Sequence, residues 1–457
     1  MKPNYFPILL SAVIPTTLLA QTAEKLPNII YIMADDMGMG DLGCYGQRYI
    51  KTPGIDSLAK QGMIFTSHYS GSTVSAPSRC VLMTGKHTGH ASIRGNLGIQ
   101  LPNGERYDSS VEDKEVTVAE VIKDKGYTSA CIGKWGLGAP ESEGHPLNQG
   151  FDYFFGYLGQ ANAHRYYPPF LWENNKKVNL DKKVYTHDLI MNKALDFIKT
   201  NSDKPFFLYL TPTIPHADLI VPKGERGIYE DMFEETPYKG GGYAADPKPK
   251  ATFAAMISRL DRDVQRVMDL LKEKGIDDNT IVVFTSDNGT HREVGHTDFF
   301  NSSAGYRGIK RDLYEGGVRT PYIVYWKNVI TAGSYSNHVS AFWDFLPTVC
   351  DITKSAVPYG VDGISFLPTL TGKGEQKEHG YLYFEFHEQG GKQSVLKDGW
   401  KLIRLNVKNP SKMRYELYDL SQDQMERRNL AAEFPDKVTE LIKIMDSART
   451  ENTRFVL

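Results

Sequence analysis

The chain has 457 residues, of which 40% are hydrophobic and 24% are charged. This is the composition of an ordinary globular protein, and the length allows a large core and about two domains. The formal net charge of -2 excludes a global field that would select nucleic acid or a membrane surface. Any polyanionic ligand must therefore be held by a local basic cluster, and we expect no nucleic-acid partner.

The first segment, residues 1–20, is predicted to be a secretory signal peptide. Lys2 precedes an apolar run from Tyr5 to Ala20, and the small Ala20 suits the position before a cleavage site. The run is short and Pro15 interrupts it, which argues against a membrane anchor, and no other segment is long and apolar enough to span a bilayer. We therefore expect an exported protein without a membrane span, either periplasmic or secreted.

Five short apolar runs follow, each with the near-continuous hydrophobicity of a strand buried on both faces: 28–33, 127–132, 205–210, 280–285 and 321–326. Amphipathic helical patterns lie between them, at 116–126, 188–200 and 253–275. Strands that alternate with helices in this way form parallel βαβ units. The sequence therefore predicts an α/β fold with a large mixed, mostly parallel sheet flanked by helices.

Polar side chains follow four of these runs at the point where each predicted strand ends: Asp35 and Asp36, Lys134, His216, and Asp287 with Asn288. In an open α/β sheet the ligand site lies beyond the carboxyl ends of the strands. Three carboxylates and an amide oxygen suit a hard cation such as Ca²⁺ or Mg²⁺. Taken singly, each acidic pair also fits a turn or a helix cap.

The stretch SAPSRCVLMTG, residues 75–85, predicts a helix that begins at Pro77, with Ser75 just outside its N-terminus and Arg79 in its first turn. Free backbone N–H groups and the positive end of the helix dipole would then face the Ser75 hydroxyl. The alternative is an ordinary helix with serine as its cap. Lys310 lies in a basic run just before the fifth strand, so these cations and His216 together suit an anionic ester whose leaving oxygen needs a proton.

The end of the chain predicts a smaller α+β domain. The runs 381–386, 394–405 and 415–420 read as antiparallel strands with turns between them, and 434–449 is an amphipathic helix. We place the main domain at 25–372 and the smaller one at 376–457. The four cysteines are scattered without metal-ligand spacing, which favours buried free thiols over a disulfide.

Taken together, these motifs are specific. S-x-P-S-R followed by L-x-T-G within 75–85 resembles the first sulfatase signature, and Gly133-Lys134-Trp135 resembles the second. Asp35-Asp36, Asp287-Asn288-Gly289 and Lys310 before residues 314–317 complete the pattern. On these residues the chain is identified as a member of the type I, formylglycine-dependent sulfatases of the alkaline-phosphatase-like superfamily. It is similar to exported carbohydrate sulfatases of gut Bacteroides.

The resemblance implies a fold, a cofactor and a set of roles. Ser75 would be oxidised to 3-oxoalanine (formylglycine) by a serine-type maturation enzyme, and the hydrate of that residue would supply the nucleophile. The substrate would be a sulfated carbohydrate. The implied roles are Ca²⁺ binding by Asp35, Asp36, Asp287 and Asn288, contacts to the modified residue by Arg79 and Lys134, and sulfate binding by Lys310 and His216.

One position departs from the family pattern. Many members carry histidine where this chain has Gly136, and that histidine is commonly assigned to proton transfer at the formylglycine. His291 and His296 are candidates to replace it or to line the substrate pocket. Further candidate sugar contacts are Arg94, Asn96, His164 and Arg165. We expect an exo-acting enzyme, with a galactose or N-acetylgalactosamine sulfate as its target.

Two other functions fit the same fold. A phosphatase or phosphodiesterase with two zinc ions would need more histidine ligands, typically an Asp-His pair where this chain has Asp287-Asn288. A non-catalytic binder of sulfated glycans would leave Ser75 unoxidised. The charged groups around the predicted site argue against the second alternative.

Overall fold

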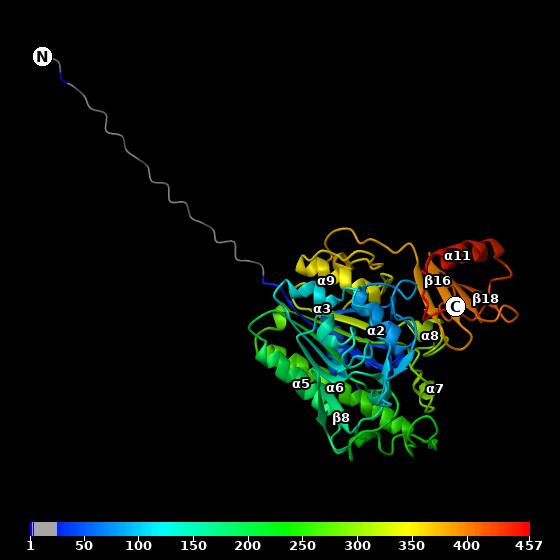
Figure 1. The fold of residues 1–457 in the computed structure, drawn as a ribbon, viewed down its shortest axis with the longest axis horizontal. Coiled ribbons are helices and arrows are strands. Elements are labelled where there is room, and N and C mark those ends of the chain that lie inside the picture. Colours follow the sequence, from blue (N-terminus) through cyan, green and yellow to red (C-terminus); the bar gives the residue numbers. More distant parts are fainter. Residues whose placement is uncertain (2, 4–24) are drawn as a thin grey trace.

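A computed structural model describes residues 1, 3 and 25–457 and contains a central ten-stranded sheet flanked by helices, with a separate four-stranded sheet at the C-terminal end (Figure 1). This is the predicted fold class. The predicted signal peptide falls almost wholly outside the described residues. Within the described part of the chain, no helix combines the length and apolar character needed to cross a bilayer.

The central sheet is mixed, with a parallel middle. Its order is β13 (Ser334–Ser336), β2 (Met63–Phe65), β12 (Tyr322–Trp326), β11 (Thr280–Ser286), β1 (Asn28–Ala34), β10 (Phe206–Thr211), β6 (Thr128–Lys134), β7 (Tyr153–Tyr157), β8 (Phe170–Glu173) and β9 (Lys176–Asn179). Strands β11, β1, β10, β6 and β7 are parallel neighbours. Strand β12 runs antiparallel to β11. All five predicted strands therefore form. The carboxyl ends of the four parallel ones, β1, β6, β10 and β11, lie at the same edge of the sheet.

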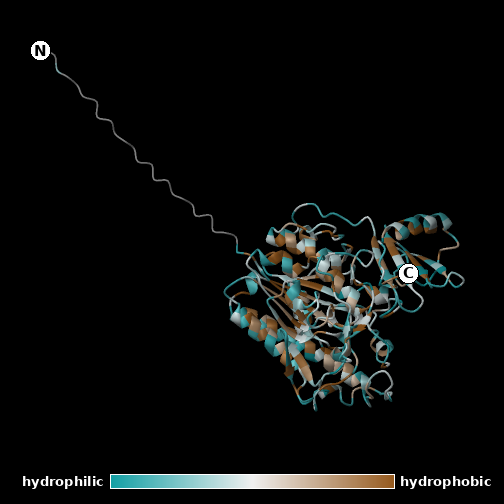
Figure 2. Ribbon diagram, in the orientation of Figure 1, coloured by the Kyte–Doolittle hydropathy of each residue, from teal (hydrophilic) through white to brown (hydrophobic). Residues whose placement is uncertain are grey.

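Helices cover both faces of this sheet. Helices α1 (Pro53–Gln61), α5 (Thr186–Thr200) and α6 (Pro249–Glu273) pack on one face, and α2 (Ser75–Thr84), α3 (Val118–Lys123) and α9 (Phe345–Thr353) pack on the other. Strand β1 shows why the sequence folds this way, because successive side chains of a strand point to opposite faces. Ile30 and Ile32 pack against the face covered by α1, α5 and α6, and Ile29 and Tyr31 pack against the face covered by α2, α3 and α9. Figure 2 shows the resulting hydrophobic strands between helices with hydrophilic outer faces.

The C-terminal unit is an antiparallel sheet of β15 (Leu382–Phe386), β16 (Lys392–Lys397), β17 (Trp400–Leu405) and β18 (Arg414–Asp419), with α11 (Pro435–Ser447) beside it. Leu441 and Met445 of α11 pack into the core of this unit. Cys44, Cys80, Cys131 and Cys350 are all free, as predicted. The remaining short elements are β3 (His68–Tyr69), β4 (Gly98–Gln100), β5 (Arg106–Asp108), α4 (Gln160–Ala163), α7 (Thr297–Phe300), α8 (Glu315–Val318), β14 (Ser340–Ala341) and α10 (Leu367–Thr371).

Candidate functional site

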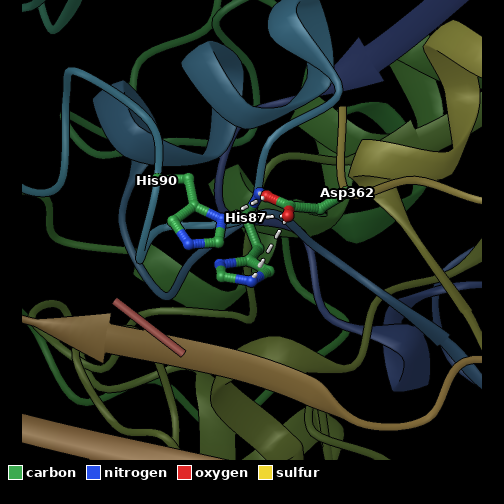
Figure 3. A group of neighbouring side chains, drawn as sticks. All are labelled: His87, His90 and Asp362. Carbon is green, nitrogen blue, oxygen red and sulfur yellow. Dashed lines mark hydrogen bonds and ion pairs between the residues drawn. The ribbon is translucent and has the colours of Figure 1, made fainter. Parts of the chain in front are cut away.

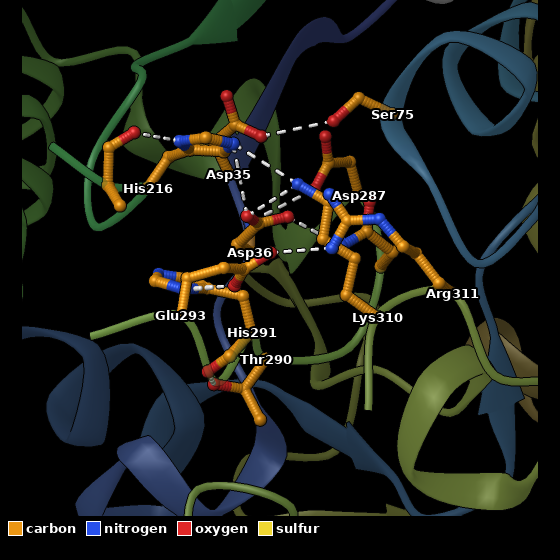
Figure 4. A network of polar contacts seen from close by, with 12 residues as sticks. Asp35, Asp36, Ser75, His216, Asp287, Thr290, His291, Glu293, Lys310 and Arg311 are labelled. Atoms are coloured by element: carbon orange, nitrogen blue, oxygen red, sulfur yellow. Dashed lines mark hydrogen bonds and ion pairs between the residues drawn. The ribbon is translucent and has the colours of Figure 1, made fainter. Parts of the chain in front are cut away.

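Two neighbouring strands bring the predicted acidic ligands together. Asp35 and Asp36 follow β1, and Asp287 and Asn288 follow β11, which pairs with β1 in parallel up to its last residue. The backbone N–H of Asp36 donates to Asp287 Oδ1 at 3.1 Å, and all four side chains are buried. Figure 4 shows Asp35, Asp36 and Asp287 converging at this sheet edge. The arrangement is the one expected of parallel strands whose carboxyl ends carry the ligands.

Three buried cations balance the three carboxylates. Arg79 Nη2 lies 2.9 Å from Asp287 Oδ2, Lys134 Nζ lies 2.7 Å from Asp35 Oδ2, and Lys310 Nζ lies 2.7 Å from Asp36 Oδ2. Burial alone would lower the pKa of Lys310, but the carboxylates of Asp36 and Asp35 hold it above the ordinary value. Lys310 therefore stays charged although it is buried.

The donor set also fits a hard cation. Asn288 Nδ2 donates to Asp36 Oδ1 at 2.7 Å, whereas Asn288 Oδ1 is buried and has no hydrogen-bond partner among the described residues. Ligand atoms of Asp35, Asp36 and His216 lie within 4.8 Å of one another. Burial and the nearby Asp35 raise the pKa of Asp287, a like-charge repulsion that a cation would relieve. Carboxylate and amide oxygens are the ligands that hard divalent cations prefer in proteins.

Ser75 lies within this cluster, but not where the sequence placed it. Helix α2 begins at Ser75 itself, with Val74 as the residue before it, so the prediction of a start at Pro77 is wrong. Proline is tolerated at its actual position because backbone N–H groups in a first turn have no helical partner. The Ser75 hydroxyl donates to Asp35 Oδ1 at 3.2 Å and accepts from Lys134 Nζ at 3.1 Å. It therefore bridges a carboxylate and an ammonium group.

His216 completes the charged cluster. Its Nε2 lies 3.1 Å from Lys310 Nζ and 3.2 Å from Asp36 Oδ2, while its Nδ1 faces the carbonyl of Ala217. A carbonyl only accepts, so the proton of the neutral ring sits on Nδ1. Burial, followed by the charge of Lys310, lowers the pKa of His216 well below its usual range. The ring of His216 is therefore neutral, and its Nε2 is a hydrogen-bond acceptor.

His164 and His291 lie on either side of His216. The rings of His164 and His216 stack with centroids 4.1 Å apart, and burial with the charges of Lys134 and Lys310 lowers the pKa of His164 to about 3. The ring of His291 lies 5.8 Å from that of His216, and its Nδ1 is 2.8 Å from Glu293 Oε2. The structure thus brings His164 and His291 to the site.

His296 lies further inside, stacked on Phe253 with ring centroids 3.7 Å apart and fully buried. Its ring centroid lies 4.9 Å from that of His291. Neither ring is the neighbour nearest to Gly136. The space above Gly136 is filled by Gln160 instead, because a Cβ atom added at Gly136 would lie 3.2 Å from Gln160 Cγ. That His291 or His296 replaces a histidine at position 136 stays a prediction.

The other predicted sugar contacts divide into two groups. Asn96 is exposed and its Oδ1 accepts the N–H of Ala76, next to Ser75, and Arg165 is an exposed residue just after His164. Arg94 differs from these two, because it is buried and its guanidinium is bonded to other parts of the chain. It donates to the carbonyl oxygens of Ala91 and Thr450 and pairs with Glu385 of β15 at 3.3 Å. A buried guanidinium needs such partners, which the C-terminal unit supplies.

A second group of possible metal ligands lies elsewhere, where His87 and His90 meet Asp362 (Figure 3). His90 Nδ1 is 2.9 Å from Asp362 Oδ1, and His87 Nε2 is 3.8 Å from the same oxygen. However, His87 Nδ1 accepts the N–H of Gly89 at 3.1 Å, so the proton of the neutral ring sits on Nε2, the atom that a metal would need. The arrangement favours a hydrogen-bonded link between loops over a metal centre.

Sequence reasoning missed two residues near Ser75. Asp108, at the end of β5, accepts the backbone N–H of Gln160 at 2.8 Å, and Gln160 Nε2 donates to Asn96 Oδ1 at 3.3 Å. Neither residue belongs to a recognisable motif. The one available signal was the missing side chain at Gly136, which predicts free space but not the residue that fills it.

Comparison with known proteins agrees with this geometry. Residues 27–355 match the family model described as Sulfatase, and residues 306–452 match the model described as N-sulphoglucosamine sulphohydrolase, C-terminal. The chain is 29% identical to an N-acetylgalactosamine-6-O-sulfatase of Bacteroides thetaiotaomicron, over 94% of each chain. It is 31% identical to the N-acetylgalactosamine-6-sulfatase of Rattus norvegicus, over 77% of this chain and 67% of the relative.

Among solved structures, the crystal structure of Ps i-CgsB in complex with k-i-k-neocarrahexaose is similar, with a TM-score of 0.80 and 25% identity over 94% of each chain. The alkaline-phosphatase-like architecture, the family match over most of the chain and the site at the sheet edge agree with one another. This protein belongs to the sulfatase family and is a sulfuric ester hydrolase.

Proposed function

We propose that this protein hydrolyses sulfate esters of glycans, with a formylglycine made from Ser75 as its reactive group and Ca²⁺ as its metal. The observation that carries the proposal is the position of the Ser75 hydroxyl between the buried Asp35 and Lys134. A plain serine that attacked sulfur would be left as a stable sulfate ester. The hydrated aldehyde would supply one hydroxyl for attack on sulfur and a second whose collapse to the carbonyl expels sulfate.

The acidic cluster is the proposed metal site. Asp35, Asp36, Asp287 and Asn288 would hold Ca²⁺, which when bound would stabilise the ionised nucleophile. The unpartnered Oδ1 of Asn288 supports this set, because a buried amide oxygen without a donor is costly unless a ligand occupies it.

The cations of the chain then act on the sulfate group. Lys310 and Lys134 present ammonium groups beside Asp36 and Ser75, where negative charge would develop on the sulfuryl oxygens. Arg79 is fully buried and forms an ion pair with Asp287, so we assign it the role of positioning that carboxylate. His216 and Lys134 are the candidates for protonating the leaving alcohol, since an anionic ester beside His216 would raise its pKa.

The glycan target is proposed from similarity and from the rim of the site. Two relatives named N-acetylgalactosamine-6-O-sulfatase and N-acetylgalactosamine-6-sulfatase, and a structural neighbour solved in complex with k-i-k-neocarrahexaose, support a galactose or N-acetylgalactosamine sulfate. His164, stacked on His216, and the exposed Asn96 and Arg165 are candidate contacts for such a sugar. We further propose exo action, export to the periplasm and maturation by a serine-type formylglycine-generating enzyme.

The decisive experiment compares protein made with and without a serine-type maturation enzyme. Mass spectrometry of the peptide that contains residue 75 should show the loss of two hydrogens, and hydrazine should trap the aldehyde. Only the matured protein should release sulfate from a panel of sulfated mono- and disaccharides, and Ser75→Ala should bind the best of them without hydrolysis. Full turnover by protein whose residue 75 is intact serine would overturn the proposal.

Two measurements separate the alternatives. Tight, stoichiometric zinc without calcium in the purified protein would favour a phosphatase or phosphodiesterase. Binding of a sulfated glycan by protein whose Ser75 stays unoxidised even when it is made with the maturation enzyme, with no release of sulfate from any member of the panel, would favour a non-catalytic binder.

A further inference from the structure

A short series of contacts joins the buried carboxylate of Asp108 to the peptide that follows the nucleophile position. Asp108 Oδ2 accepts the backbone N–H of Gln160 at 2.8 Å. The side chain of Gln160 donates from Nε2 to Asn96 Oδ1 at 3.3 Å. That same oxygen of Asn96 accepts the backbone N–H of Ala76 at 3.0 Å. Asn96 Oδ1 therefore serves two donors, one from the helix that carries Ser75 and one from Gln160.

The Ala76 contact bears directly on Ser75. Ala76 is the second residue of α2, so its N–H has no partner within the helix. Asn96 supplies that partner and so fixes the peptide plane that joins residues 75 and 76. Asn96 is itself exposed, and a long-lived single rotamer at an exposed position needs a second contact. Gln160 provides that second contact.

Gln160 is held more firmly than Asn96. Its side chain is only 8% exposed, and its backbone is tied to Asp108. It lies against Gly136, which has a φ of +76° and whose added Cβ would meet Gln160 Cγ at 3.2 Å and Nε2 at 3.6 Å. A side chain at Gly136 would be strained by this φ and would make the Gln160 side chain shift by a few tenths of an ångström. The glycine opens the space in which Gln160 reaches Asn96.

We propose that Gln160 is a positioning residue for the nucleophile at position 75, acting through Asn96 on the 75–76 peptide. In this role it keeps the side chain of residue 75 between Asp35 and Lys134. The inference rests on the proposed function, because it assigns a role in the same reaction. The proposal also fixes the direction of the hydrogen bond. Asn96 Oδ1 accepts from both neighbours, so the group at position 160 must be a hydrogen-bond donor.

The first test needs neither the aldehyde nor turnover. In unmatured protein, the amide hydrogen of Ala76 should exchange with deuterium about tenfold faster in Gln160→Ala than in wild type, because one supporting hydrogen bond is lost. Asn162→Ala is the matched control, since Asn162 lies in the same short helix and its side chain makes no hydrogen bond to the described residues. Equal exchange in wild type and Gln160→Ala would overturn the proposal.

The second test separates positioning from sugar binding. With rates expressed per aldehyde found by mass spectrometry, Gln160→Ala should lower kcat about tenfold to a hundredfold with little change in KM, as expected for a misplaced reacting group. A rise in KM alone, or no change, would overturn the proposal. If wild-type protein forms no aldehyde and has no activity, the proposed function fails instead, and the exchange result still decides the structural part.

The third test uses the polarity of the contact, and it covers the case in which Gln160→Ala folds poorly. Gln160→Glu keeps the size of the side chain, but an ionised carboxylate cannot donate to Asn96. Burial and the neighbouring Asp108 should raise the pKa of the introduced carboxyl into an accessible range. A protonated carboxyl can donate to Asn96. The kcat of Gln160→Glu relative to wild type should therefore recover as the pH falls, whereas that of Gln160→Ala should show no such recovery. Parallel pH profiles for Gln160→Glu and wild type would overturn the proposal.

Discussion

Lys310 Nζ lies 2.7 Å from Asp36 Oδ2, so the cation proposed to bind sulfate is paired with a proposed metal ligand. A bound metal and Lys310 would therefore compete for the same carboxylate. The outcome of that competition determines how free Lys310 is to contact an ester.

Lys310→Met should separate the two roles. We expect kcat/KM to fall by about a thousandfold or more, because a buried charge facing the sulfate is lost. Metal affinity should stay the same or rise, since a competing cation has been removed from Asp36. Steady-state kinetics and titration calorimetry with Ca²⁺ measure the two effects. Lys327→Met, at an exposed surface pair with Asp277, is the matched control and should change neither; a loss of metal binding in Lys310→Met would contradict this account.

Removal of the metal should abolish activity without unfolding the protein. The three carboxylates already have three buried cationic partners, so the site keeps its charge balance when the metal leaves. Treatment with a calcium chelator should lower the Tm only by the amount that metal binding to the folded state adds to its stability. Activity should return on addition of Ca²⁺. Loss of the near-UV circular dichroism signal on chelation would show instead that the metal holds the fold together.

Most of this site could be predicted from the sequence because its parts follow recognisable strands. Asp35, Asp287 and Lys134 each stand at the end of a buried run whose hydrophobicity marks the strand, and parallel pairing then brings those ends together. The C-terminal sheet was predictable for a similar reason, since turns separate its alternating strands. Strands β2, β7, β8, β9 and β13 were missed because they are short or lie at sheet edges.

The remaining errors have a common physical origin in long-range packing. Arg94 follows the Ser75 helix by only a few residues, yet its partner is Glu385, which lies 291 positions away in the chain. His296 looked available in a polar stretch but stacks on Phe253 of α6. Gln160 contacts Asn96 while it packs directly against Gly136. A local sequence pattern does not show which distant residues pack against it, so these contacts could not be predicted from the sequence of one segment.

Lys401 should be essential for the contact between α8 and the C-terminal sheet. This buried lysine of β17 lies 2.8 Å from Glu315 Oε1 and 3.0 Å from Glu426 Oε1. Lys401→Met would leave two neighbouring carboxylates without their common counter-ion, which should cost about 3–5 kcal/mol of unfolding free energy. Urea unfolding monitored by tryptophan fluorescence measures the loss. Lys397→Met, which removes a more exposed ion pair in the neighbouring strand, should change stability by about 1 kcal/mol or less.

His87 should make the protein less stable in mild acid. Burial lowers its pKa to about 4, whereas an unfolded histidine titrates near its ordinary value of about 6.5. Between these values the unfolded chain binds a proton that the folded chain does not, so the free energy of unfolding falls as the pH falls through this window. The slope from one such group approaches about 1.4 kcal/mol per pH unit.

The variant His87→Asn tests this contribution. Its side-chain oxygen can still accept the N–H of Gly89, as His87 Nδ1 does, but it has no proton to gain. We therefore expect the free energy of unfolding of His87→Asn to change less between pH 4 and pH 7 than that of wild type. His90→Asn serves as the comparison, since that ring is more exposed and hydrogen-bonds to Asp362. If chemical unfolding shows the same acid slope in His87→Asn as in wild type, the acid sensitivity arises from other groups, because the neutral side chain removes the only titration that His87 could contribute.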